Sequence, residues 1–134
     1  MTITFDGISI AASGMNAYQT WLDAIADNIA NINTITATDE EPFQERLVRV
    51  EARDLNAVVG GVDVVEPPVA ETDGRLVYDP TNPLADDDGM VLAPAMDLEG
   101  LMTDMIIAQR SFQANTNVLN RARETYERTL EIGQ

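Results

Sequence analysis

Two stripes of apolar residues, one near each end of the chain, constrain the fold more than any other feature of the sequence. In each stripe the spacing between successive positions alternates between three and four residues. This heptad spacing places side chains along one face of an α-helix and is typical of helices that pack as coiled coils. We therefore predict a long helix at each end. The N-terminal stripe comprises Ile8, Ala11, Met15, Tyr18, Leu22, Ile25, Ile29 and Ile32, and the C-terminal stripe comprises Leu101, Met105, Ala108, Phe112, Asn115, Leu119, Ala122, Tyr126 and Thr129.

Five single residues refine the two predicted helices. Asp6 and Asp97 are predicted N-caps, because a carboxylate there can accept hydrogen bonds from the backbone N–H groups of the first turn. Gly133 is a predicted C-terminal stop. Gly14 costs a helix about 1 kcal/mol relative to alanine, so we expect close helix packing or a bend at this position. Asn115 is a polar residue within its stripe, and such an asparagine can fix helix register and partner number.

The sequence between the stripes is strand-like and rich in turns. The segments RLVRVEA and GRLVYDP contain clustered β-branched residues, and the pairs Gly60-Gly61 and Asp88-Gly89 are typical of turns. We therefore predict the α+β class, with long terminal heptad helices that form a coiled-coil core and a small β-rich insertion between them. The predicted parts are a helix over residues 1–34, a linker with a small β-rich domain over residues 35–95, and a helix over residues 96–134.

The predicted C-terminal helix is too long for one compact domain. A helix over residues 97–132 would extend for roughly 54 Å at 1.5 Å per residue. A compact chain of this length has a radius of gyration of about 14 Å, which corresponds to a ball about 36 Å across. We therefore expect an elongated molecule whose apolar stripes are covered by each other or by neighbouring subunits.

Charge and composition exclude several classes of function. The chain has 23 acids against 8 bases, a net charge of −15, and every base is an arginine. We expect no nucleic-acid partner, because phosphate binding needs a basic surface. The acidity is interpreted first as a source of solubility, with a salt-rich habitat or a basic partner as alternatives. The absence of cysteine and histidine removes disulfides, thiolate metal sites and the commonest general base, so we expect no cofactor and no metal.

Carboxylates are the remaining candidates for catalysis or metal binding. An EF-hand alignment around Gly89 would place Leu84 and Ala95 at the first and last ligand positions, so the turn is not expected to bind calcium. Other carboxylates recur at helical spacing, and we interpret them as solvated helix faces rather than acid–base pairs. They are Asp23, Asp27, Glu124, Glu127 and Glu131.

No targeting or membrane segment is expected from the sequence. The first basic residue is Arg46, so the N-terminus lacks the positive charge of a secretory signal. No apolar run is long enough to span a bilayer, so we expect no direct membrane insertion. By these ordinary signals alone the chain is expected in the cytosol.

The stretch DNIANINT ends the first predicted helix with three asparagines. The amides of Asn28, Asn31 and Asn33 compete with backbone hydrogen bonds and lower helix propensity. Interpreted from the residues alone, these amides bind the unpaired carbonyl groups where the helix ends.

Four segments resemble bacterial flagellar axial proteins. The sequence SGM at residues 13–15, followed by NIANINT at residues 28–34, resembles the N-terminal signature that rod, hook and hook-associated proteins share. The stretches DPTNPLADDDGMVLAP at residues 79–94 and AQRSFQAN at residues 108–115 resemble the short rod proteins of the flagellar basal body. The resemblance covers nearly the whole chain, from Ile8 to Glu131.

This resemblance implies a structural subunit of the proximal rod. It implies terminal helices that form the core of a helical array, built from copies of the chain and from other rod subunits, which transmits torque as a drive shaft. It also implies export from the cytoplasm through the flagellar type III apparatus without a cleaved signal peptide. That apparatus and the membrane ring at the base of the rod are the other implied partners. The asparagines gain a second role as polar contacts between subunits.

Residues on or beside the two stripes are expected to contact neighbouring subunits. The alternatives left open are another rod or hook-type axial protein, a cytosolic coiled-coil adaptor with a β-head, and, third, a carboxylate-dependent enzyme. The expected assembly residues are Ile8, Met15, Leu22, Ile25, Asn28, Ile29, Asn31, Ile32, Leu101, Met105, Phe112, Asn115, Leu119 and Tyr126.

Overall fold

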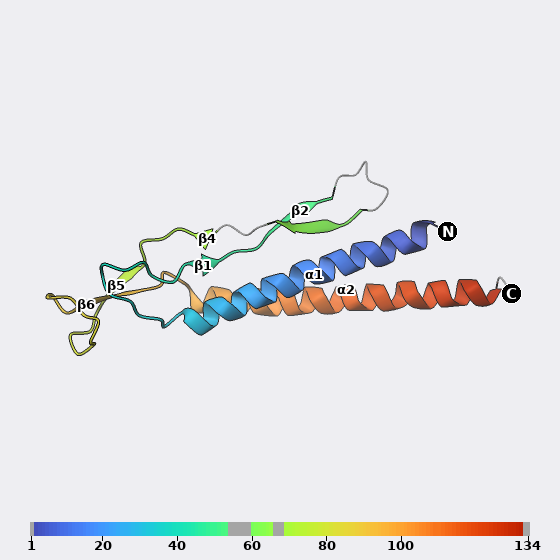
Figure 1. The fold of residues 1–134 in the computed structure, drawn as a ribbon. Helices are drawn as coiled ribbons and strands as arrows, with labels where there is room; N and C mark the ends of the chain where they lie inside the picture. Colours follow the sequence, from blue (N-terminus) through green and yellow to red (C-terminus); the bar gives the residue numbers. More distant parts are fainter. Residues whose placement is uncertain (1, 54–59, 66–68, 133–134) are drawn as a thin grey trace.

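Two long antiparallel helices lie side by side and contain about half of the residues (Figure 1). A computed structural model describes residues 2–53, 60–65 and 69–132 of the chain. The expected α+β class is confirmed, since short antiparallel strands lie between the helices in sequence. The elements in chain order are α1 (Thr2–Asn31), β1 (Glu45–Arg46), β2 (Arg49–Ala52), β3 (Val62–Val65), β4 (Val69–Ala70), β5 (Arg75–Tyr78), β6 (Met90–Ala93) and α2 (Leu98–Ile132).

The two predicted apolar stripes pack against each other within one chain. Ile25 of α1 is 2% exposed, and Leu101 and Ala108 of α2 are 5% and 0% exposed. These three residues form one buried cluster, so the stripes need no neighbouring molecule to begin their burial. The half-buried side chains packed against the cluster are Tyr18, Trp21, Leu22, Ile29, Ile32, Met96 and Met105.

The structure confirms one predicted helix cap and corrects the other. The carboxylate of Asp97 accepts hydrogen bonds from the backbone N–H groups of Glu99 at 3.2 Å and Gly100 at 3.0 Å, as expected of an N-cap. The prediction that Asp6 caps the first helix is wrong, because α1 already begins at Thr2. The predicted stop at Gly133 lies outside the described residues.

The strands form three separate two-stranded antiparallel sheets rather than one continuous sheet. The pairs are β1 with β4, β2 with β3, and β5 with β6. The predicted strand RLVRVEA is interrupted, since β1 ends at Arg46 and β2 begins at Arg49. The turn predicted at Asp88-Gly89 is confirmed: Gly89 has a φ of 75°, and its N–H donates to the Asp86 carbonyl at 2.9 Å.

The β5–β6 pair and the segment after α1 form a small head at the end of the helix pair where α1 ends and α2 begins (Figure 1). Val91 and Ala93 of β6 are 0% and 2% exposed. Thr36 exchanges two backbone hydrogen bonds with Leu92, each 2.9 Å long, which ties the end of the linker to this strand. The head therefore fixes the turn of the chain between α1 and the strands.

Within the described part of the chain, neither helix has a stretch sufficiently long and apolar to cross a membrane.

Candidate assembly interface

The strands β1, β2 and β3, together called the arm below, lie along α1 on a face that does not contact α2 (Figure 1). Asn28 fixes the near end of the arm. Its side-chain Nδ2 donates to the Arg46 carbonyl at 2.9 Å, and its Oδ1 accepts from the Arg46 N–H at 2.8 Å. The side chain of Arg46 also pairs with Asp27. Asn28 thus binds the arm as a neighbouring strand would, with one donor and one acceptor.

Ser13 fixes the far end of the arm. Its hydroxyl donates to the Ile10 carbonyl at 2.8 Å and accepts from the Val62 N–H at 3.1 Å. Gly61, which precedes Val62, has a φ of 133°, and a Cβ there would lie 2.5 Å from the Ser13 oxygen. Glycine is therefore required by both the backbone conformation and the close approach.

Small residues between Ser13 and Asn28 let the arm approach α1 closely. Ala17 and Ala24 are 8% and 5% exposed, and they lie on the same side of α1 as Ser13 and Asn28. The heptad pattern of large apolar side chains does not reveal this second face. The spacing of 13, 17, 24 and 28 is helical, and the small side chains are the signal that could have revealed it.

The residues of the SGM segment have three different contacts. Ser13 binds the arm, whereas Gly14 faces Asn115 of α2: a Cβ added at Gly14 would lie 3.3 Å from the Asn115 amide. Met15 accepts a hydrogen bond on sulfur from the Thr116 hydroxyl at 3.9 Å. Close helix packing at Gly14 is thus confirmed, and it occurs where α2 carries its polar Asn115.

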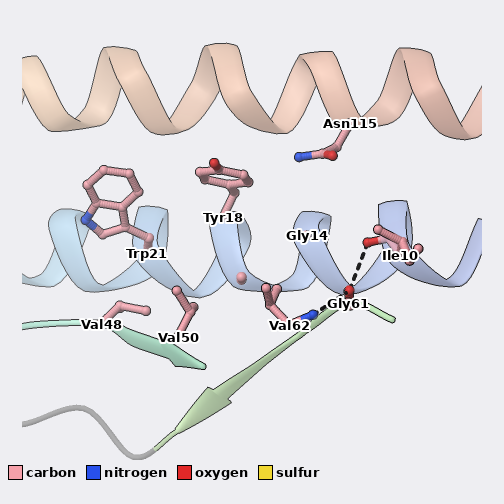
Figure 2. Close-up of a pocket in the computed structure, with 11 residues that line it drawn as sticks. Ile10, Gly14, Tyr18, Trp21, Val48, Val50, Gly61, Val62 and Asn115 are labelled. Carbon is pink, nitrogen blue, oxygen red and sulfur yellow. Dashed lines mark hydrogen bonds between the residues drawn. The ribbon is translucent and has the colours of Figure 1, made fainter. Parts of the chain in front are cut away.

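A groove of about 480 Å³ opens between α1, the arm and α2 (Figure 2). Tyr18, Trp21 and Asn115 border it on the side of the helix pair, and Val48, Val50 and Val62 border it on the side of the strands. The Tyr18 and Trp21 rings are tilted, with their centroids 6.3 Å apart. Most of the lining is apolar, so the groove is suited to apolar contact rather than to bond-making chemistry.

Burial along the helix pair falls toward the end that carries both termini. Ile25 and Leu101, near the head, are buried inside one chain. The stripe residues around them, Leu22, Ile29, Ile32 and Met105, are half-buried. Nearer the termini the stripe residues are half-buried as well, apart from the buried Ala11 and the exposed Thr129. The half-buried expected assembly residues in this part are Ile8, Met15, Phe112, Asn115, Leu119 and Tyr126.

The asparagines expected to contact other subunits are used within the chain. Asn28 is 1% exposed, and both of its amide atoms bind Arg46. Asn31 donates from Nδ2 to the Asp27 carbonyl at 2.9 Å and accepts from the Thr34 hydroxyl at 3.2 Å. Asn31 thus ends the helix as the residue-based interpretation expected, whereas Asn28 was not expected to hold the arm.

Exposed ion pairs and hydrogen bonds lower the pKa of several carboxylates. The Arg53 guanidinium lies 2.7 Å from the Asp63 carboxylate, and its hydrogen bond lowers the pKa of Asp63. In the head, the N–H of Met90 lowers the pKa of Asp86, helped by the Thr38 hydroxyl and the Asp88 N–H. Among the described residues no group of three or more carboxylates is arranged to hold a metal ion. These carboxylates therefore stabilise turns and strands.

Comparison with known proteins agrees with the segments that resemble axial proteins. A family model described as flagella basal body rod protein matches residues 8–36, which span most of α1 and its asparagine ending. A second model, described as the C-terminal part of flagellar basal body rod FlgEFG proteins, matches residues 89–132, which include β6 and α2. The flagellar basal-body rod protein FlgC of Escherichia coli O6:H1 is 36% identical over 126 residues, with 93% of this chain and 94% of that protein covered. The chain belongs to the FlgC family of flagellar basal-body rod proteins.

Other FlgC proteins show the same extent of similarity. The Salmonella typhimurium protein is 38% identical over 127 residues, and the Aquifex aeolicus protein is 35% identical over 128 residues. Coverage is 93% of this chain and 94% of the Salmonella protein, and 95% of each chain for Aquifex. The similarity to FlgC thus includes both helices, the arm and the head.

Proposed function

We propose that the chain is a non-enzymatic structural subunit of the flagellar basal-body rod, located in its proximal part. The observation that carries this proposal is the similarity to FlgC proteins over 93% of the chain, which includes every element of the fold. The residue chemistry is consistent with a structural role, since the chain has no histidine or cysteine and the groove between α1, the arm and α2 is lined mainly by apolar groups. Membership of the family supports a location in the basal body.

We propose that assembly buries apolar surface that stays accessible to solvent in a single chain. The half-buried residues near the termini, such as Phe112 and Leu119, present apolar surface that a neighbouring subunit can cover. Copies of the chain and other rod subunits would stack in a helical array, and packed helices would transmit torque along it. Heterologous contacts of this kind form open helical assemblies when the rotation does not close.

Export and contacts at the base belong to the same proposal. We propose that the chain leaves the cytoplasm through the flagellar type III apparatus without cleavage of a signal peptide. In the rod it would lie near that apparatus and the membrane ring. Membership of the FlgC family is the support for the proposed export route and for the proposed contacts at the base.

A deletion strain tests the function directly. We expect cells that lack the chain to be non-motile and their basal bodies, viewed by electron microscopy, to lack a complete rod. Reintroduction of the wild-type gene should restore both. A complete rod and hook in the deletion strain would refute the proposed function.

A further inference from the structure

The face of α2 turned away from α1 carries three arginines that make no ion pair with any described residue. Arg110, Arg121 and Arg128 are separated by eleven and seven residues, which places them within about 20° of one line along the helix. By contrast, Arg123 pairs with Glu127 at 2.9 Å on the same helix. In a chain with 23 acids and 8 bases, three unpaired arginines on one line are unexpected.

Exposed apolar side chains flank this arginine line. Ile106, Ile107 and Val118 are 50%, 47% and 53% exposed. Helical geometry places Ile106 and Ile107 on the side of α2 away from the buried Leu101 and Ala108, and Val118 at the edge of that side. Arginine combined with exposed aliphatic surface is a common composition for the central contacts of a protein interface. The outer face of α2 therefore has the composition of a protein interface, although no described part of the same chain covers it.

A surface of opposite charge lies in the head. Residues 33–97, which include the arm as well as the head, contain fifteen acids and four arginines, a net charge of −11. A hollow of about 910 Å³ there has five carboxylates and no basic residue in its lining. Leu76, which also lines it, is 61% exposed and supplies apolar surface at its edge. The five acids of this hollow are Asp39, Glu40, Glu41, Glu71 and Asp73.

The two surfaces cannot meet within one molecule. The head lies beyond the end of the helix pair where α2 begins, whereas Arg121 and Arg128 lie toward the opposite end, which carries the termini (Figure 1). Arg121 is roughly 35 Å along the helix from Leu98, at 1.5 Å per residue. Only another molecule can bring the arginine line and the acidic hollow together.

We propose that the acidic hollow in the head of one copy of this chain binds the arginine line on α2 of a second copy. Because the two surfaces differ and lie toward opposite ends, the contact is head-to-tail and can repeat. The apolar flanks of each surface, with Leu76 on one and Ile106 and Val118 on the other, would be buried together. The inference rests on the proposed function and specifies which surfaces join successive copies.

Sedimentation velocity of the purified full-length chain across a series of NaCl concentrations tests this contact. We expect self-association at low salt that weakens as salt rises, because screening lengths fall from about 10 Å at 0.1 M to about 3 Å at 1 M. The double variant Arg121→Glu/Arg128→Glu should lower the association constant by about tenfold or more. Arg123→Gln is the matched control, since it changes charge on the same helix outside the arginine line, and it should associate as the wild type does.

A charge exchange makes the test specific to the two surfaces. The head variant Glu40→Arg/Glu41→Arg/Glu71→Arg, which leaves two carboxylates in the hollow against three arginines, should also associate poorly by itself. Mixed with the α2 double variant, it should restore assemblies longer than a pair, because each head then faces an α2 of opposite charge. Circular dichroism of every variant should match that of the wild type, which excludes misfolding as the cause of weaker association. The neutral variant Arg121→Gln/Arg128→Gln should lower the association constant by an intermediate amount.

Three results would overturn the inference. They are a wild-type chain that stays monomeric at low salt even if it binds other rod proteins, unchanged association of both charge-reversed variants, and a mixture of the two variants that forms no long assemblies. None of these results would refute the rod function, which the deletion strain tests. A complete rod in that strain would refute the function and leave the salt-dependent contact standing.

Discussion

Asn28 is the single residue on which the position of the arm most depends. Replacing it by alanine leaves the N–H and carbonyl of Arg46 without their partner, and leaves a small void where the amide was buried. We expect Asn28→Ala to lower the free energy of unfolding by about 1–3 kcal/mol in urea denaturation. Asn33→Ala is the control, because Asn33 is exposed on the same helix ending, and it should change stability by less than about 0.5 kcal/mol. Equal effects of the two changes would contradict the role assigned to Asn28.

Gly14 and Asn115 form a pair whose coupling can be measured. Alanine at Gly14 should gain up to about 1 kcal/mol of helix propensity, but its Cβ would lie 3.3 Å from the Asn115 amide. We therefore expect Gly14→Ala to stabilise an Asn115→Ala background more than it stabilises the wild type. A double-mutant cycle by thermal unfolding gives the difference, and additive effects would show that the two residues do not interact across the helices.

At the scale of elements, the attachment of the arm can be tested with two adjacent glycines. Alanine at Gly61 requires a φ that L-residues rarely adopt and places a Cβ 2.5 Å from the Ser13 oxygen. Alanine at Gly60 meets only Ile10, at 3.4 Å, which is ordinary contact. We expect Gly61→Ala to detach the far end of the arm and to shift the fluorescence of Trp21, the sole tryptophan, to longer wavelength. An unshifted Gly61→Ala spectrum, or an equal shift for Gly60→Ala, would contradict this attachment.

The turn between β5 and β6 should respond to acid through Asp86. Its pKa is lowered in the folded state by the Met90 N–H, so its stabilising effect is fully present above the ordinary aspartate pKa of about 3.9. That effect is lost as pH falls through the lowered folded-state pKa. We expect amide hydrogen exchange at Gly89 and Met90 to lose protection in this acidic range. Asp86→Ala should remove the pH dependence, whereas Asp87→Ala, at the adjacent exposed position, should preserve it.

The helices could be predicted from the sequence because their signal is periodic and local. Heptad spacing placed Ile25 and Leu101 on the correct faces, and the Asp97 cap followed from its own side chain. The path of the arm could not be predicted in this way. It depends on contacts between residues distant in sequence, such as Asn28 with Arg46 and Ser13 with Val62, and a polar residue in a helix does not reveal its partner. The assembly surfaces could not be predicted either, since heptad spacing does not indicate whether a stripe is covered by its own chain or by another.

At the scale of the whole molecule, the extended shape is a measurable property. α2 has 35 residues and extends for roughly 52 Å at 1.5 Å per residue, and the head lies beyond its first turn. We expect small-angle X-ray scattering from monomer at high salt to give a radius of gyration clearly above the value of about 14 Å for a compact chain of this length. A value close to 14 Å would mean that the helix pair folds back on itself in solution.

The order of the two helices along the chain has a kinetic consequence. Helical proteins usually fold fast because their contacts join residues close in sequence, but here the Met15–Thr116 contact joins residues 101 positions apart. The arm and head can form beforehand, whereas α1 finds its partner only after almost the entire polypeptide is available. The contacts between α1 and α2 therefore raise the contact order above that of a helix pair joined by a short loop, and we expect slower folding than for such a pair. A chain that emerges through a narrow passage from either end would keep its longest helices unpaired until the final segment is released.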